Sequence, residues 1–163
     1  MAATYQIREI EITDNVEIKS VIQNLFIEMN LPLVGTAYSD PELNDMFAVY
    51  NDNRSIYYVV SDGCKVFGGG GIRQLEGADE TYCELQKLYF SPQIRGLGFG
   101  KQVIKACLDF ALTAGYQHCY LESKAELHAA INLFRENGFM PIDAPIGNTG
   151  HHACEVQMLK SLL

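Results

Sequence analysis

Hydrophobic positions near the start of the chain change from strand spacing to helical spacing. Residues 5–12 predict a strand, and a helix follows Asp14, which can form a capping box with Glu17. The predicted inner face of that helix consists of Ile18, Val21, Ile22, Leu25, Phe26 and Met29. The chain therefore opens with a strand and an amphipathic helix.

The middle of the chain predicts a loop, a short helix and a hairpin. The loop covers residues 31–40 and the short helix residues 41–50. Two strands at 55–61 and 64–73 are expected to turn at Asp62-Gly63, a strong hairpin signal. A third strand of this sheet is expected after the hairpin.

The second half alternates strands with two amphipathic helices that end at glycines. One helix runs from Gly98 to Gly115, and a second begins at a Ser123/Glu126 capping box and stops at Gly138. The predicted strands are 81–90, 118–122, 139–142 and 153–159. Together these elements predict one α+β domain over residues 1–163 with a mostly antiparallel sheet.

Composition narrows the class of protein. The chain has 163 residues, 48% hydrophobic and 20% charged, which suits one globular domain. No apolar run is long enough for a membrane span, and no secretory signal is visible, so no membrane partner is expected. Five scattered cysteines give neither a disulfide framework nor a zinc motif, which favours a cytoplasmic setting. A net charge of -8 argues against nucleic-acid binding.

The charge is unevenly distributed. Residues 85–108 contain no acidic residue, whereas Lys87, Arg95, Lys101 and Lys105 lie among them. A positive stretch in an acidic protein suggests that an anion is held at one place. Chance clustering on a solvated face is the alternative interpretation.

A glycine-rich turn, Arg95-Gly96-Leu97-Gly98-Phe99-Gly100-Lys101, lies between a predicted strand and a long helix. Free N–H groups and the helix dipole make such a terminus a phosphate site. The turn fails the Walker A pattern, because Arg95 and Gln102 stand where glycine and Ser/Thr are needed. It also fails the dinucleotide fingerprint at Lys101. The glycine run 68–71 lies within a strand and predicts a bulge or tight strand crossing.

The turn matches the Arg/Gln-x-x-Gly-x-Gly/Ala signature of the GNAT N-acetyltransferase superfamily at Arg95, Gly98 and Gly100. The preceding segment 84–92 resembles the fourth strand of that family and its proline-bearing turn. Residues 130–139 resemble the family's helix that ends in Gly-Phe. The resemblance covers essentially the whole chain and implies a sheet of six to seven strands flanked by about four helices.

The resemblance also implies acetyl-coenzyme A as cofactor, with coenzyme A as product. Its pantetheine amides would pair with the main chain of Leu88, Tyr89 and Phe90. Arg95 would start the turn that binds the pyrophosphate, and the amides that contact it would be those of Gly96, Leu97, Gly98, Phe99, Gly100 and Lys101. In this hypothesis the positive stretch faces the phosphates of the cofactor.

Acetyl transfer requires a neutral amine, and removing the proton of an alkylamine at pH 7 costs about 4 to 5 kcal/mol. Glu84 matches the family's fourth-strand glutamate and is the candidate base, directly or through water. Two family positions differ: the usual acid tyrosine falls at Phe134, and the cofactor-contacting asparagine falls at Leu127. Either the thiolate leaves unaided, or Tyr89, Tyr120 or a water replaces the acid.

The loop before the last strand contains His151-His152, and the resemblance places the substrate pocket there. Adjacent strand positions point to opposite faces, so one histidine at most is expected in the pocket, and His151 is the substrate candidate. No metal site is expected, because no third ligand is evident. Cys83 and Cys119 are predicted to be core residues, so we expect direct transfer in a ternary complex without an acetyl-cysteine intermediate.

The leading hypothesis is therefore an N-acetyltransferase that acetylates a primary amine of a small molecule or peptide. The alternative is a catalytically silent acyl-coenzyme A-binding sensor or partner module. The resemblance assigns acceptor specificity to residues 31–38 and 146–152, where the sequence matches no known substrate code. The final strand and the exposed sheet edges are compatible with a homodimer.

Overall fold

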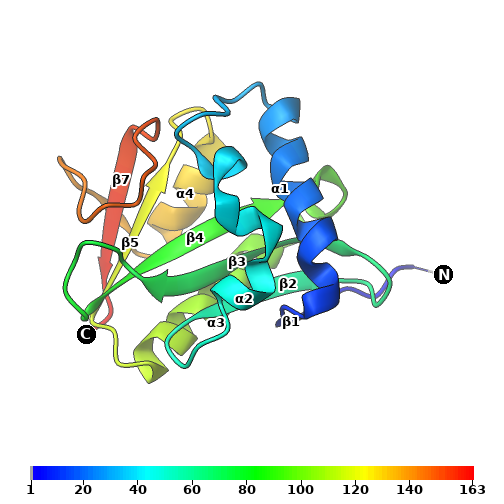
Figure 1. Ribbon diagram of the computed structural model, residues 1–163, viewed down its shortest axis with the longest axis horizontal. Coiled ribbons are helices and arrows are strands. Elements are labelled where there is room, and N and C mark those ends of the chain that lie inside the picture. The colour runs from blue at the N-terminus through cyan, green and yellow to red at the C-terminus, as the bar shows by residue number, and fades with distance from the viewer. Residues whose placement is uncertain (1) are drawn as a thin grey trace.

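The protein was analysed as a computed structural model, which describes residues 2–163. Within these residues the strands form one seven-stranded sheet in the order β1-β2-β3-β4-β5-β7-β6 (Figure 1). The strands are β1 (Gln6–Glu9), β2 (Ile56–Ser61), β3 (Val66–Gln74), β4 (Tyr82–Phe90), β5 (His118–Ser123), β6 (Met140–Pro141) and β7 (Val156–Ser161). Within this range the sheet is antiparallel except where β4 meets β5.

Helices cover both faces of the sheet. Helices α1 and α2 lie on one face, and α3 and α4 lie on the other (Figure 1). The four α-helices of residues 2–163 are α1 (Asn15–Glu28), α2 (Met46–Val49), α3 (Phe99–Thr113) and α4 (His128–Glu136). The predicted α+β class, with a mostly antiparallel sheet of six to seven strands and about four helices, is confirmed.

Strand alternation divides the core into two clusters. In β2, Ile56 and Val60 face α3, whereas Tyr57 and Val59 face α1. The α3 side also contains the buried Cys107, and the α1 side the buried Phe26. Both faces of the central strands are thus buried, so polar side chains on them need local partners.

The glycine run of β3 permits close strand crossing, as predicted. A Cβ atom at Gly69 would lie 2.1 Å from the Tyr58 carbonyl oxygen, and one at Gly68 would lie 2.3 Å from that of Tyr89. The β3–β4 register shifts between Gly69 and Gly71, and Lys87 in β4 has a φ of 51°. These observations define a β-bulge in the middle of β4.

The bulge changes which β4 side chains share a face. Before it, Leu85 packs on the α3 side, and after it, Leu88 does so too. Gln86 and Lys87 therefore both lie on the α1/α2 side, together with Glu84. This arrangement gathers polar side chains on one face of a central strand.

Both predicted capping boxes are wrong. The Asp14 carboxylate accepts from Arg8 and from the Glu11 N–H, while Glu17 accepts from the Val66 N–H. Ser123 still belongs to β5, and α4 begins only at His128. Asp14 and Glu17 thus bond to residues outside α1, and Ser123 donates to the neighbouring Lys124 carbonyl, so neither predicted box forms.

Three further features bear on the predicted elements. The expected helix at 41–50 divides into a 3₁₀ turn, Pro41–Asn44, and the single-turn α2, with Asp45 between them. The remaining 3₁₀ turns are Ile12–Asp14, Ala37–Ser39 and Pro92–Ile94.

None of the helices described for residues 2–163 has the length and apolar character that a bilayer crossing requires.

Candidate active site

The glycine turn presents a row of unpaired main-chain donors at the start of α3. Gly96 and Gly98 adopt φ values of 76° and 88°, and Gly98 is the N-cap residue. The first N–H group of this segment that makes a helical hydrogen bond is that of Gln102, which donates to the Gly98 carbonyl. The N–H groups of residues 96–101 find no acceptor among the described residues. Six donors at the positive end of a helix dipole make this turn a candidate anion site.

The predicted positive patch is largely neutralised in the folded chain. Arg95 pairs with Glu28 at 2.8 Å, Lys105 pairs with Asp109, and Lys87 is buried on the other side of β4. Only Lys101, of these four cations, has no ion-pair partner in the part of the chain that the structure describes. Most of the charge of this stretch is thus matched by carboxylates, and its role toward the cofactor phosphates stays a prediction. Main-chain donors, more than side-chain charge, characterise the candidate anion site.

A gap opens between β4 and β5 beside this turn. The two strands pair only from Tyr82 to Glu84 and then diverge (Figure 1). The Ser91 N–H donates to the Phe67 carbonyl in β3. By alternation the main chain of Tyr89 also faces β3, and that of Leu88 and Phe90 faces the gap. Two of the three predicted pantetheine-binding residues thus direct main-chain groups into the gap.

Glu84 lies at the closed end of the gap. It is the last β4 residue paired with β5, and its residue exposure is 5%. Burial raises the pKa of its carboxyl to about 7, against a hydrogen bond from Gln86 that lowers it. A carboxyl group with that pKa changes protonation state at neutral pH, as a general base must.

The Gln86 amide is itself held in one orientation. The Tyr50 hydroxyl donates to Gln86 Oε1 at 2.7 Å, so the Gln86 NH₂ group is directed to Glu84 Oε2, also at 2.7 Å. Tyr50 is buried beneath the sheet face against Tyr57. This chain of bonds fixes one oxygen of Glu84.

A charged network lies beside Glu84. Lys87 Nζ, nearly inaccessible to solvent, contacts Asp40 at 3.2 Å and Glu42 at 3.1 Å. His151 Nε2 lies 2.8 Å from Asp40 Oδ2, and Arg73 Nη1 lies 2.7 Å from Glu42. Burial lowers the pKa of His151, but the hydrogen bond and charge of Asp40, together with the charge of Glu84, raise it, and the net shift is upward. The network joins the segment around Asp40 to the loop before β7.

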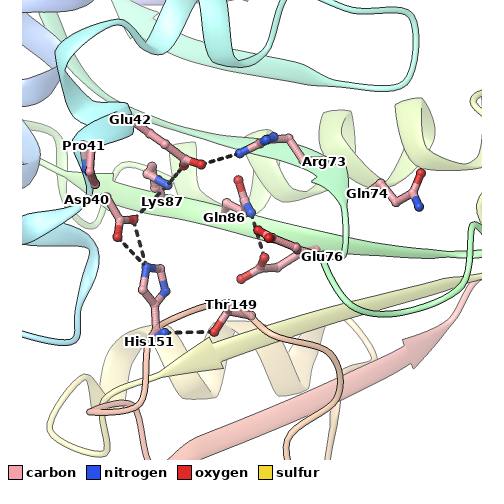
Figure 2. Close-up of a pocket in the computed structure, with 11 residues that line it drawn as sticks. Asp40, Pro41, Glu42, Arg73, Gln74, Glu76, Gln86, Lys87, Thr149 and His151 are labelled. Atoms are coloured by element: carbon pink, nitrogen blue, oxygen red, sulfur yellow. Dashed lines mark hydrogen bonds and ion pairs between the residues drawn. The ribbon is translucent and has the colours of Figure 1, made fainter.

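These side chains surround a cavity of about 220 Å³ (Figure 2). Figure 2 shows Asp40 and His151 facing each other on one side, with Arg73 directed to Glu42 above them. Glu84, Gln86 and Thr149 also line the cavity. It opens on the α1/α2 face of β4, beside the predicted base.

The histidines and cysteines take the predicted positions. His151 lines the cavity and His152 does not; His152 is exposed next to Gly35. Cys83 and Cys119 are fully buried. Phe134, at the position of the family's acid tyrosine, packs against Phe139 in the core.

Three residues that can ligate metals meet in space, which the sequence did not suggest. Donor atoms of Glu84, Glu122 and His151 lie within 4.8 Å of one another. Each donor side chain already has a partner: Gln86 for Glu84, Thr149 for Glu122 and Asp40 for His151. We therefore treat these residues as parts of a polar pocket, and the expectation of no metal stays a prediction.

Tyr89 and Tyr120 are poor proton donors as they stand. Burial raises the pKa of both hydroxyls well above the usual value. The Tyr120 hydroxyl accepts the Ile146 N–H at 3.3 Å, and the Tyr89 ring packs against Phe26. Neither geometry distinguishes one of them as the acid.

Sequence reasoning missed Asp40, Glu42, Arg73 and Gln86 as cavity residues. Asp40 and Glu42 carry no motif, and only tertiary folding brings them to β4. The sequence did contain a signal for Gln86 and Arg73. Gln86 lies two residues after Glu84 and so shares its face of β4, and Arg73 is the register partner of Glu84 in β3.

The splayed mixed sheet, the candidate anion-binding turn at its opening and the buried carboxylate at its apex are compatible with an acyl-coenzyme A-dependent N-acyltransferase. The chain belongs to the acetyltransferase (GNAT) family, whose family model matches residues 21–139. It is an N-acetyltransferase. A similar protein is the uncharacterized N-acetyltransferase YjgM of Escherichia coli (strain K12), 40% identical over 156 residues, covering 95% of this chain and 93% of that one.

Solved structures show the same fold. An acetyltransferase of the GNAT family from Staphylococcus aureus Mu50 aligns with a TM-score of 0.87 at 18% identity, covering 98% of this chain and all of that one. The PaiA N-acetyltransferase of Thermoplasma acidophilum, solved in complex with coenzyme A, aligns with a TM-score of 0.72 at 15% identity. The alignment covers 97% of this chain and 99% of that one.

Proposed function

We propose that residues 1–163 form one domain that transfers acetyl from acetyl-coenzyme A to the primary amine of a small acceptor. One observation carries this proposal: six unpaired N–H groups adjoin a gap in the sheet that leads to Glu84. Coenzyme A combines a pyrophosphate, an amide-bearing pantetheine and a reactive thioester in the same order. The coenzyme A held by the related Thermoplasma fold supports this assignment.

The cofactor assignment uses main-chain groups almost throughout. The N–H groups of residues 96–101 bind the pyrophosphate, and the main chain of Leu88 and the Phe90 N–H offer partners to the pantetheine amides. Arg95 holds the turn in place, since its Nε donates to the Phe90 carbonyl at 2.8 Å. Lys101 supplies a free positive charge beside the helix terminus.

Glu84 is the general base in this proposal. Its raised pKa, about 7, lets it accept the ammonium proton, after which the neutral nitrogen attacks the thioester carbonyl. The tetrahedral intermediate then expels the coenzyme A thiolate, and the second proton of the attacking nitrogen passes to that thiolate or to solvent as the neutral amide forms. A thiol pKa near 8.5 makes the thiolate an adequate leaving group without an acid at Phe134. His151 lines the acceptor side of the cavity.

The state of the cysteines also supports a reducing compartment for this protein. All five cysteines are free thiols, and three of them are buried in the core. We place the enzyme in the cytoplasm on this ground.

The decisive experiment compares the wild type with Glu84→Gln in two assays. Calorimetric titration measures acetyl-coenzyme A binding, and thiol release with a panel of amines measures transfer. Glu84→Gln should bind the cofactor almost unchanged and lose about a hundredfold or more in turnover. Glu136→Gln, on the exposed surface of α4, is the matched control and should retain activity.

Two outcomes would contradict the proposal. Cofactor binding by the wild type without thiol release from any amine would favour a silent acyl-coenzyme A-binding module. A Glu84→Gln enzyme as active as the control would exclude the carboxylate as base.

A further inference from the structure

The acceptor cavity is polar to an unusual degree. Among the described residues that line it, only Pro41 lacks a polar side chain. Its volume, about 220 Å³, is below the roughly 300–1,000 Å³ typical of pockets for drug-sized ligands. An apolar acceptor group would leave these polar atoms without partners, which is costly. The bound part of the acceptor is therefore small and hydrophilic.

Charges of both signs are nearly balanced around this cavity. Arg73, Lys87 and His151 are its cationic groups, and they contact the carboxylates of Asp40 and Glu42. With His151 protonated, this part of the site has one more positive charge than negative. Glu84, when it is ionised as the base, and Glu76, which also lines the cavity, add two negative charges, so the complete lining has one more negative charge than positive. A lining with cations and carboxylates in nearly equal number suits an acceptor that carries both charges better than a dianion or a polycation.

Arg73 and Glu84 occupy adjacent places on one face of the sheet. They are register partners across β3 and β4, so their Cβ atoms lie about 5 Å apart. No bond joins the two side chains, because Arg73 uses Nη1 for Glu42 and Glu84 accepts from Gln86. The other N–H donors of Arg73 have no acceptor among the described residues. The pair thus offers a cation and a carboxylate side by side.

We propose that the acceptor is a small zwitterion, an α-amino acid or a similar amino carboxylate, bound with its carboxylate on Arg73 and its amine at Glu84. This inference rests on the proposed function. A guanidinium recognises a carboxylate through its planar pair of donors, and the neighbouring Glu84 receives the ammonium proton. The nitrogen that loses its proton to Glu84 forms the new amide bond to acetyl as the coenzyme A thiolate leaves.

Matched sets of acceptors test the inference. For several side chains, thiol release is measured with the free amino acid, its carboxamide and its decarboxylated amine, for example serine, serinamide and ethanolamine. Spermidine and a short peptide represent the polycation and peptide classes. The α-amine of the carboxamide loses its proton more easily than the α-amine of the free amino acid, because no carboxylate charge lies beside it. A preference for the amino acid must therefore come from recognition of its carboxylate. We expect kcat/KM to be about tenfold or more higher for the free amino acid.

Variants at Arg73 assign that preference to a residue. Arg73→Met should bring the ratio of kcat/KM for serine and ethanolamine close to one, and Lys105→Met, on the exposed face of α3, should leave the ratio unchanged. If Arg73→Met does not fold, as judged by thermal melting, Arg73→Lys tests the same ratio, because it keeps the charge without the planar fork.

The possible results separate this inference from the proposed function. Equal use of all three acceptors, or best use of spermidine or the peptide, would overturn the zwitterion assignment while leaving acetyl transfer established. An unchanged ratio in both Arg73 variants would also overturn it. Absence of thiol release from every acceptor would contradict the proposed function and this inference with it.

Discussion

At Glu84, burial and hydrogen bonding act in opposite directions on one carboxyl group. Burial raises its pKa, while the Gln86 amide and the charges of His151 and Lys87 lower it, and the result is about 7. Full desolvation without these partners would keep the group protonated at neutral pH. The Tyr50 hydroxyl, by orienting Gln86, contributes to this balance without contacting the carboxylate.

This balance predicts the pH dependence of the reaction. A base must be ionised to act, so kcat/KM should fall as pH drops below about 7, approaching tenfold for each pH unit, and level off above it. The profile is measured by thiol release with two acceptors whose amine pKa values differ. The limb near pH 7 should stay in place for both, since it belongs to the enzyme. A limb that follows the acceptor pKa would show that the acceptor, and not Glu84, determines the profile.

At the scale of elements, helix α3 has a left-handed glycine at each end. Gly98 is its N-cap with a φ of 88°, and Gly115 follows its last turn with a φ of 89°. Neither position is crowded: a Cβ would meet only Gln102 Nε2 at 3.8 Å at Gly98 and nothing within 4 Å at Gly115. The two glycines therefore have the same conformational role, but only Gly98 lies in the anion site.

Because Gly98 and Gly115 have the same conformational role, their alanine variants form a matched pair. Gly98→Ala and Gly115→Ala should each lower the free energy of unfolding by about 1–2 kcal/mol, because alanine is strained in the left-handed region. Gly98→Ala should also weaken acetyl-coenzyme A binding about tenfold or more, since relief of strain turns the N–H groups away from the pyrophosphate. Denaturant unfolding and calorimetric titration measure the two effects. Equal cofactor affinity in both variants would show that the turn does not hold the phosphates.

At the scale of the whole molecule, the net charge of the protein does not favour an anionic cofactor, and the proposed cofactor site depends on local main-chain donors instead. The protein has a net charge of -8, and three cations of the expected positive stretch are paired with carboxylates. In the proposed cofactor site, long-range electrostatics therefore oppose the approach of an anionic cofactor, and short-range main-chain donors are the groups proposed to bind it.

Salt should therefore speed association without weakening the complex. Raising ionic strength from about 0.1 M to about 1 M shortens the Debye length from about 10 Å to about 3 Å and screens the repulsion. We expect a higher association rate constant for acetyl-coenzyme A and a Kd within about threefold, measured by stopped-flow fluorescence and calorimetry. Glu28→Gln, which frees Arg95, should make affinity higher at low salt and more salt-sensitive. A wild-type Kd that rises steeply with salt would contradict this account.

Local patterns in the sequence determined most of the elements and the candidate cofactor site. Apolar spacing predicted the helix that became α1, and Asp62-Gly63 predicted the β2–β3 hairpin. Glycines marked the turn before α3 because positive φ and close strand approach are properties of single residues and their neighbours. The family signature at Arg95, Gly98 and Gly100 depends on the same short-range geometry. Glu84 as base remains a prediction from that resemblance.

Only the tertiary structure decided the use of charged and polar side chains. Asp14 and Glu17 fit a capping box in the sequence, yet Asp14 bonds Arg8 of β1 and Glu17 bonds the Val66 N–H of β3. In the sequence, Lys87 belongs to the positive stretch expected to face the cofactor phosphates. In the structure, the β4 bulge places Lys87 against Asp40 and Glu42. The acceptor cavity combines segments more than a hundred residues apart, as the Asp40–His151 pair shows. Hydrophobic periodicity reports burial within one element, whereas a charged side chain is stabilised by whichever partner the folded chain brings near, and no local pattern records that partner.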